Sequence, residues 1–226
     1  MRTIAILPVK SFGAAKNRLA ERLAPGSRQA VAQAMFADVL TSLRHVAELA
    51  AIAVVTADHT AESAATGHRV QVLHDPEESG QSQAAMVGIR YALASGYERA
   101  LLVPGDTPLL EAGEVSSLLA RAAEAQIAVV VVPDRHGTGT NALLLTPPDA
   151  IEPSFGERSL ERHVAAAREA GLTCSVDPLP SLVLDVDTPE DLEELSGRLD
   201  QRRGPAPVTR GALRQLGRAR GERVSA

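Results

Sequence analysis

The sequence predicts an α/β fold in which a single, mostly parallel sheet carries helices on both faces. Apolar segments of strand length alternate with helical segments over the first 130 residues, an order that is typical of doubly wound sheets. Residues 2–9 are apolar almost throughout, as expected of a strand that is buried on both faces. The 226 residues suit one globular domain rather than two.

The order of the elements follows from apolar runs and helix-end signals. Ser27 can cap a helix whose apolar stripe runs from Val31 to Val46 at helical spacing. Thr188 and Asp191 form a capping box with Pro189 at the first helical position, so they start the last helix. We expect further helices at residues 81–96, 113–125 and 158–170, and further strands at 50–57, 69–74, 99–106, 127–133, 141–147 and 181–187.

Residues 201–226 differ in composition from the rest of the chain. They carry seven Arg against one acid, Glu222, and their Gly and Pro residues accompany no apolar periodicity. We therefore expect one folded domain over residues 1–200 and an Arg-rich tail at 201–226 that is disordered. A tail that binds nucleic acid or a partner protein is the alternative.

Charge, cysteine content and hydropathy exclude several classes of function. The net charge is −5, and the +6 of the tail leaves −11 on residues 1–200, which argues against nucleic acid as the main partner. Cys174 is the single cysteine, so an internal disulfide and a Cys-rich zinc site are excluded. No apolar run approaches the ~20 residues of a membrane span. We expect a cytoplasmic protein without a membrane partner, and a homodimer is compatible with the sequence.

The reactive residue types fall in the loops that follow strands, which is where ligands bind in open parallel sheets. The loop after the first strand holds Lys10, Ser11, Lys16 and Arg18, and the chain has no other lysine. Cations and backbone N–H groups on a Gly-containing loop suit a triphosphate, although the pattern is not that of a P-loop. A solvated basic loop is the alternative.

Polar loops that could hold a nucleobase follow the second and third strands. Thr56 and Asp58 follow the second strand, and Gly80 opens a helix after the third. Because the carboxyl ends of parallel strands meet at one edge of a sheet, we expect these residues beside the basic loop. They complete the predicted nucleotide-binding set.

Two acids at strand ends indicate a metal site. Asp106 lies where an apolar strand breaks into a Gly-Asp turn, and Asp187 ends another strand. Mg²⁺ prefers such oxygen ligands and can join them to phosphate oxygens. The alternatives are a turn former at Asp106 and an acid that merely starts a helix at Asp187, with Asp185 facing solvent.

A second anion site is expected between a Gly/Thr-rich turn at residues 135–141 and a helix start at 156–159. Turn hydroxyls and the N–H groups of a helix start both donate to anions. An ordinary helix cap at Ser159 is the alternative, and His163, one turn further along, is expected to be structural or to line the rim. The donors expected in this site are Thr138, Thr140, Asn141, Gly156 and Ser159.

Two anion sites that flank an acidic metal site are the arrangement that nucleotidyl transfer requires. A nucleoside triphosphate lies on one side and a phosphorylated acceptor on the other, the acceptor phosphate attacks the α-phosphorus, and pyrophosphate leaves. Lys10, Lys16 and Asp106 are the predicted catalytic residues: the two lysines stabilise the leaving phosphates, and Asp106 holds the Mg²⁺ that neutralises charge. This displacement needs no covalent nucleophile, and no Ser–His or Cys–His pairing is evident in the sequence.

Six segments carry a resemblance to a known family: LPVKSFGAAKNRL, VVTAD, VPGDTPLL, GTGTNALLL, FGERSLERHV and LDVDTPEDL. Over about residues 2–199 the chain resembles the guanylyltransferases of coenzyme F-420 biosynthesis, called CofC or FbiD. The resemblance implies a Rossmann-like nucleotidyltransferase fold of the GT-A/MobA type, with GTP, Mg²⁺ and phosphoenolpyruvate or 2-phospho-L-lactate as ligands. It also implies acid-binding contacts at Thr140 (or Thr138), Gly156 and Ser159, and metal contacts at Asp106 and Asp187.

One segment departs from the family. Many members have Gly-Leu-Asn where this chain has Gly80-Gln81-Ser82-Gln83, so an amide of Gln81 or Gln83 would replace that of Asn near the base. The alternatives are a cytidylyl-, sugar-phosphate or molybdopterin-type nucleotidyltransferase on the same fold, a glycosyltransferase, and a nucleotide-binding module without catalytic activity.

Overall fold

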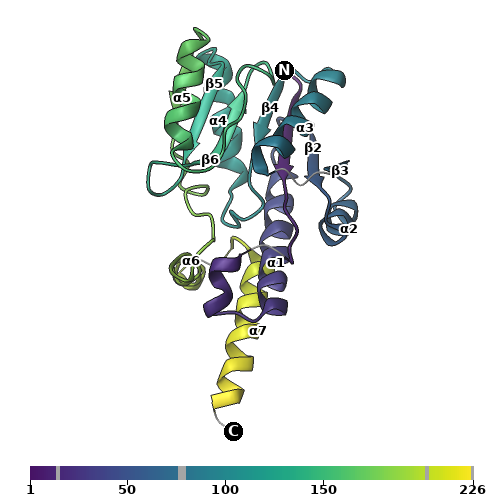
Figure 1. Ribbon diagram of the computed structural model, residues 1–226, viewed down its shortest axis with the longest axis vertical. Helices are drawn as coiled ribbons and strands as arrows, with labels where there is room; N and C mark the ends of the chain where they lie inside the picture. Colours follow the sequence, from purple (N-terminus) through teal and green to yellow (C-terminus); the bar gives the residue numbers. More distant parts are fainter. Residues whose placement is uncertain (14–15, 76–79, 202–203, 225–226) are drawn as a thin grey trace.

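The computed structural model describes residues 1–13, 16–75, 80–201 and 204–224, which form a seven-stranded sheet in the order β3-β2-β1-β4-β6-β5-β7 (Figure 1). Neighbouring strands are parallel except at β6, which runs antiparallel to β4 and β5. The predicted α/β class with a mostly parallel sheet is therefore confirmed. The strands are β1 Thr3–Pro8, β2 Leu49–Thr56, β3 Gln71–His74, β4 Arg99–Leu102, β5 Val129–Pro133, β6 Thr140–Leu145 and β7 Cys174–Val176.

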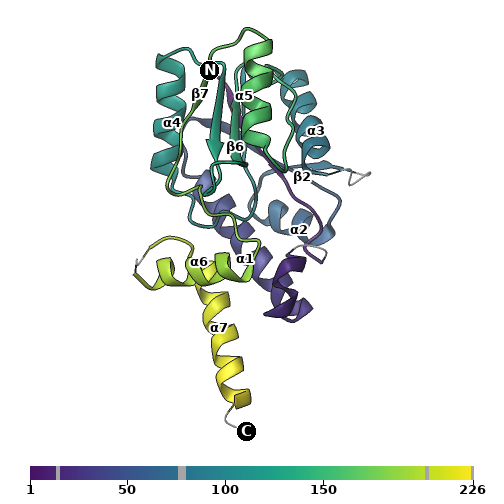
Figure 2. The same cartoon turned by 60° about the vertical axis from the view of Figure 1, so that its left-hand side comes forward.

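Helices cover both faces of the sheet because successive strand residues point to opposite sides. In β1, Ala5 and Leu7 pack under α1, α2 and α4, whereas Ile4 and Ile6 pack under α3 and α5 (Figure 2). None of the described helices is long and apolar enough to cross a membrane. The helices are the 3-10 helix η1 Asn17–Glu21 and the α-helices α1 Pro25–Leu43, α2 His59–Gly67, α3 Gln81–Ala94, α4 Ala112–Glu124, α5 Ser159–Glu169, α6 Pro189–Gln201 and α7 Pro207–Val224.

The antiparallel strand β6 decides what lies at the carboxyl edge of the sheet. β5 ends at this edge with Pro133, the chain turns through residues 134–139, and β6 starts there with Thr140. Asp134 holds the turn, since its Oδ1 accepts hydrogen bonds from the N–H groups of His136 and Thr138 at 3.1 and 3.0 Å. The Gly/Thr-rich turn therefore faces the same edge as the loops that follow β1 and β4.

Two predicted boundaries shift because of proline. Helix α1 begins at Pro25, whose fixed φ suits the first helical position, so Ser27 lies inside the first turn and is not the cap. Strand β4 ends at Leu102, and Pro104 cannot donate to a strand ladder. The chain therefore turns before Asp106 instead of reaching it as a strand.

Residues 181–187 do not form the predicted strand. The place beside β5 is taken by β7, which pairs with it in parallel. Leu182, Leu184 and Val186 are nevertheless buried, because they pack against the helices near the carboxyl edge. The N–H of Val186 donates to the carbonyl of Asp106 at 3.3 Å, so this extended segment joins the turn after β4 rather than a ladder.

The prediction of a disordered tail is wrong over residues 207–224, which form α7 (Figure 1). The start of α7 is capped from another part of the chain: the buried carboxylate of Asp38 in α1 accepts hydrogen bonds from the N–H groups of Val208 and Thr209 at 3.1 and 2.7 Å. Leu213 and Leu216 add apolar contacts near α1. Residues 202–203 and 225–226 of the predicted tail lie outside the described residues.

Replacing Asp38 with Ala is expected to detach the first turn of α7, because two N–H groups lose their acceptor. An N-cap of this kind contributes about 0.5–2 kcal/mol. Hydrogen exchange should show faster exchange of the amides of Val208 and Thr209 than in the wild type. Asp38→Asn, which keeps one acceptor oxygen, should fall in between, and unchanged exchange in Asp38→Ala would contradict this account.

Candidate active site

A cavity of about 320 Å³ opens at the carboxyl edge of the sheet. Its walls come from the loop after β1, the start of α3, the turn after β4 and the segment before α6. Five of the predicted site residues line it: Lys10, Lys16, Gly80, Asp106 and Asp187.

Lys16 lies between two carboxylates at this edge of the sheet. Its backbone is left-handed, with a φ of 60° directly before η1, which is uncommon for a residue other than glycine. Its Nζ lies 2.5 Å from Asp106 Oδ2 and 2.8 Å from Asp187 Oδ1, and its side chain is only 6% exposed. Burial acts to lower the pKa of Lys16, but the two carboxylates outweigh it and raise that pKa above the ordinary value. The ammonium therefore stays charged while buried.

The cations of the loop after β1 lower the pKa of Asp187. Burial acts to raise its pKa, but the charge and hydrogen bond of Lys16, followed by the charges of Arg18 and Lys10, hold that pKa below its ordinary value. Arg18 and Lys10 are themselves exposed to solvent. The three cations of the loop thus gather around an anion, which is what a loop that binds phosphates must also do.

A third carboxylate, Asp185, stands beside the pair. Burial, and then the negative charges of Asp106 and Asp187, raise the pKa of Asp185 to about 6. Asn141 donates to Asp185 Oδ1 at 3.3 Å and to the carbonyl of Leu182 at 2.6 Å. Asp185 is thus half-buried rather than solvent-facing, and the amide of Asn141 is used within the protein instead of pointing to an anion.

The donor set suits a divalent cation that is shared with a phosphorylated substrate. Asp106 Oδ1 is buried and has no hydrogen-bond partner among the described residues, while Oδ2 of the same carboxylate binds Lys16. Magnesium commonly takes one or two carboxylates and completes its coordination with phosphate oxygens and water. Within the described ranges, no group of three or more His, Cys, Asp or Glu side chains is arranged to hold a metal by itself.

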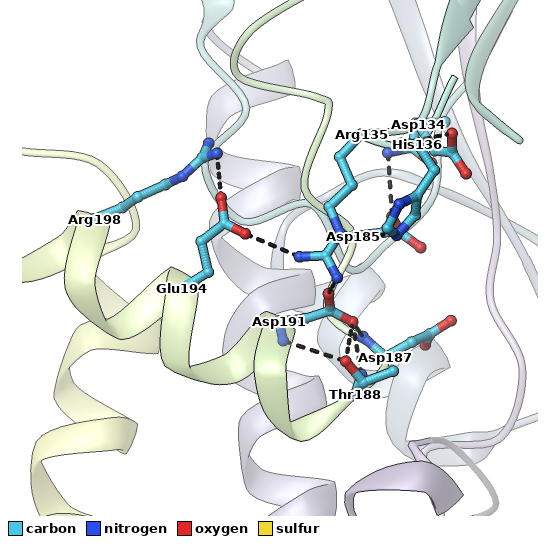
Figure 3. A network of polar contacts seen from close by, with 10 residues as sticks. Asp134, Arg135, His136, Asp185, Asp187, Thr188, Asp191, Glu194 and Arg198 are labelled. Atoms are coloured by element: carbon cyan, nitrogen blue, oxygen red, sulfur yellow. Dashed lines mark hydrogen bonds and ion pairs between the residues drawn. The ribbon is translucent and has the colours of Figure 1, made fainter. Parts of the chain in front are cut away.

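Arg135 connects the turn at residues 134–139 to the start of α6, as Figure 3 shows. Its guanidinium lies 2.6 Å from Asp191 Oδ1 and 2.9 Å from Glu194 Oε2. The other oxygen of Asp191 accepts from the N–H groups of Asp187 and Thr188 at 3.0 and 2.7 Å and from the Thr188 hydroxyl at 2.9 Å. The predicted capping box is confirmed, and it holds the backbone of Asp187 in place.

The two segments predicted as a second anion site do come together. The N–H of Leu160 in the first turn of α5 donates to the carbonyl of Thr138 at 3.1 Å, and Thr140 Oγ1 lies 3.0 Å from Nδ1 of His163. Gly156 has a φ of 109°, a conformation that favours glycine. Thr140 and Ser159 are almost fully buried, so the predicted donors sit in a tight corner between β6 and α5.

Three predicted nucleotide-binding residues have structural partners instead and do not line the cavity. Asp58 is the N-cap of α2 and accepts from two N–H groups of its first turn, from Ser11 Oγ at 2.9 Å and from the N–H of Phe12 at 3.0 Å. Thr56 Oγ1 accepts from the N–H of Asp58 at 3.1 Å. Burial acts to raise the pKa of Asp58, but these hydrogen bonds lower it. Asp58 therefore anchors the basic loop to α2.

The cavity wall also contains residues to which the sequence assigned no role. Phe12 and Val9 supply an apolar surface, and the buried Asp75 follows β3 at the same edge. The position after a strand was the available signal for Asp75, whereas nothing local marked Phe12. Of the two glutamines that depart from the family pattern, Gln81 lines the cavity and Gln83 is exposed.

A model of the CofC-like guanylyl transferase family matches residues 3–205, which is most of the chain. The chain belongs to this family. The comparison agrees with the resemblance found in the sequence, and it covers every element that contributes to the cavity.

Relatives of the CofC family extend over nearly the whole chain. A phosphoenolpyruvate guanylyltransferase of Conexibacter woesei is 50% identical over 96% of this chain and 97% of its own. A 2-phospho-L-lactate guanylyltransferase of Methanothermobacter thermautotrophicus is 36% identical over 86% of this chain and 84% of its own.

A crystal structure described as a nucleotide-diphospho-sugar transferase, from Desulfovibrio desulfuricans, superimposes with a TM-score of 0.75. The similarity covers 95% of both chains at 18% identity. This comparison supports the fold, which is the Rossmann-like nucleotidyltransferase architecture that the sequence predicted.

Replacing Arg135 with Ala is expected to lower the free energy of unfolding by about 1–3 kcal/mol, because it leaves the nearly buried carboxylate of Asp191 without its cation. Urea denaturation measures this loss. Glu161→Gln is the matched control: it breaks an ion pair with Arg158 in which both side chains are about two-thirds exposed, so about 0.5 kcal/mol or less is expected. Equal losses in the two variants would contradict the role given to Arg135.

Proposed function

We propose that this protein transfers GMP from GTP to the phosphate of a three-carbon phosphorylated acid, phosphoenolpyruvate or 2-phospho-L-lactate, and releases pyrophosphate. The observation that carries the proposal is the convergence of Lys16 with Asp106 and Asp187 in the wall of the cavity, in a chain of the CofC family. This cluster supplies both a cation for phosphates and oxygens for a metal, at the edge where such sheets bind ligands.

The reaction proposed for this edge is a direct displacement. A phosphate oxygen of the acceptor attacks the α-phosphorus of GTP, a new phosphorus–oxygen bond forms, and the bond from the α-phosphorus to the oxygen that bridges to the β-phosphorus breaks. The electron pair of that bond leaves with pyrophosphate. Lys16 and Lys10 oppose the charge that grows on the leaving group, and their effect is larger in the transition state than in the ground state.

Asp106 and Asp187 would hold Mg²⁺. The ion would supply charge neutralisation and would orient the phosphates when it is bound. Asp106 Oδ1, which has no donor within the part of the chain that the structure describes, supports this assignment, because a buried carboxylate oxygen without a donor is costly unless a ligand takes it. Lys16 balances the same two carboxylates within the protein.

The acceptor would bind between the start of β6 and the start of α5. Thr140 and Ser159 offer hydroxyl groups there, and Gly156 lets the backbone adopt its left-handed conformation. Ser82 Oγ of α3 accepts from the N–H of Phe155 at 2.9 Å, which ties this corner to the nucleotide cavity. A small acid with a phosphate and a carboxylate suits so compact a corner.

The setting proposed for this reaction is coenzyme F-420 biosynthesis in the cytoplasm, where GTP and phosphorylated three-carbon acids are available. The single, half-buried Cys174 agrees with a reducing compartment. The alternative of a cytidylyl- or sugar-type nucleotidyltransferase is not favoured. Both relatives described above are named guanylyltransferases, and each aligns with this chain over most of its own length.

Pyrophosphate release tests the function directly. Each of the four nucleoside triphosphates is combined with phosphoenolpyruvate, 2-phospho-L-lactate or 3-phosphoglycerate in the presence of Mg²⁺. Release is expected with GTP and one of the first two acids. Release with CTP but not with GTP, release with GTP only when the acceptor is 3-phosphoglycerate, or no release in any GTP reaction would overturn the proposal.

Asp106→Asn is expected to keep the fold but to lower turnover by roughly a hundredfold at limiting Mg²⁺, because an amide is a poor ligand for this ion. Excess Mg²⁺ should recover part of the rate. Asp177→Asn is the control, because Asp177 pairs with Arg121 and does not line the cavity. It should change neither the rate nor its dependence on Mg²⁺. Near-normal turnover of Asp106→Asn at limiting Mg²⁺ would contradict the assignment.

Gly156→Ala is expected to raise the Michaelis constant of the acceptor and to leave that of GTP nearly unchanged. Its new Cβ would meet only Arg162 Nη2, at 3.9 Å, so the cost comes from a φ of 109° that side chains rarely adopt. A shift of the turn by such strain would cost about 1–3 kcal/mol. Gly113→Ala in α4, which has open space and no positive φ, is the control. An effect on GTP alone would show that the two halves of the site are reversed.

A further inference from the structure

His163 is fully buried on α5, one turn after Ser159, and both of its ring nitrogens are engaged. Nε2 lies 2.9 Å from the backbone nitrogen of Ser154, and Nδ1 lies 3.0 Å from Thr140 Oγ1. The ring of Phe155 packs edge-on against the imidazole with centroids 5.3 Å apart. One side chain therefore links β6, α5 and the segment that precedes α5. His163 does not line the rim, as the sequence had left open.

The hydrogen bonds determine which ring nitrogen carries the proton. A backbone N–H can only donate, so Nε2 must accept from Ser154. Burial, and then the charge of Arg162, lower the pKa of His163 to about 4, so the ring is neutral near pH 7 and has one proton. That proton lies on Nδ1, and His163 donates it to Thr140 Oγ1 at 3.0 Å.

This donation determines what the Thr140 hydroxyl can do. A hydroxyl has one proton and accepts through its lone pairs. Because Thr140 Oγ1 accepts from His163, its own proton points away from the ring. Among the residues that the structure describes, no group within hydrogen-bond distance accepts that proton. The hydroxyl therefore has a donor available for an anion in the corner between β6 and α5.

We propose that His163 is a positioning residue of the acceptor site, which orients the Thr140 hydroxyl as a hydrogen-bond donor toward the phosphate or carboxylate of the acceptor. The proposal rests on the proposed function and extends it. The same ring holds the N–H of Ser154, two residues before Gly156 with its positive φ, so it also sets where the second wall of the corner lies. His163 acts through Thr140 and does not itself touch the acceptor.

Two substitutions separate the two hydrogen bonds. In His163→Asn, the amide nitrogen can occupy the place of Nδ1 and still donate to Thr140, but the bond from Ser154 is lost. In His163→Gln, the amide oxygen can occupy the place of Nε2 and still accept from Ser154, but the donation to Thr140 is lost. The two variants are of similar polarity, and each removes one hydrogen bond.

The Michaelis constants of acceptor and GTP are measured for both variants by pyrophosphate release, together with the thermal midpoint. His163→Gln is expected to raise the acceptor constant about tenfold and to change the GTP constant less than twofold, whereas His163→Asn should keep an acceptor constant within about threefold of the wild type. His45→Gln, in the turn that follows α1, controls for a His→Gln change outside this corner. An unchanged Michaelis constant for GTP shows that the variant is folded.

A double-mutant cycle with Thr140→Val completes the test. If His163 acts through Thr140, His163→Gln adds less than twofold to the acceptor constant once Thr140 is Val. Acceptor constants that follow the thermal midpoint in both variants, or effects that multiply fully in the double mutant, would overturn the role of His163 while leaving the proposed function intact. A wild-type protein that releases no pyrophosphate with any acceptor would overturn both.

Discussion

The carboxyl edge of the sheet depends on the ion pairs that the buried ammonium of Lys16 forms with Asp106 and Asp187. Asp106, Asp185 and Asp187 bring three carboxylates to this edge, and two like charges about 4 Å apart repel by roughly 4 kcal/mol near a protein surface. Lys16 offsets this repulsion for Asp106 and Asp187. Asp185 has an amide rather than a cation as its neighbour, and burial, followed by the charges of the other two carboxylates, raises its pKa.

The two halves of the site rest on different parts of the fold. The cavity proposed to bind the nucleotide lies on the loop after β1 and the start of α3, whereas the corner proposed to bind the acceptor lies on the β5–β6 turn and α5. Arg135 and Asp191 join the turn to the segment that holds Asp187, and Ser82 joins α3 to Phe155. Such cross-links would keep the two proposed ligands at a fixed separation, which an in-line transfer requires.

Local patterns predicted the elements well where burial decides the structure. The apolar run of β1, the capping box at Thr188 and the helix after Gly80 were all predicted from residues within a few positions of one another. The segment at 181–187 was mistaken for a strand because its apolar alternation fits a strand equally well. Whether such a segment joins a ladder depends on which partner edge is free, and β7 had taken that edge.

The sequence by itself determined the α/β class and the edge of the sheet at which the acids and lysines gather, because strand periodicity and loop position are properties of short segments. Only the tertiary structure decided which polar residues remain available. Asp58 accepts hydrogen bonds from Ser11 and Phe12 in the loop after β1, and Asp38 orders a tail that looks disordered from composition alone. The sequence predicts His163 only as a structural or rim residue, and its contacts with Thr140 and Ser154 appear in the tertiary structure alone. Each of these outcomes depends on a hydrogen bond to a group distant in the chain, and no local pattern encodes such a partner.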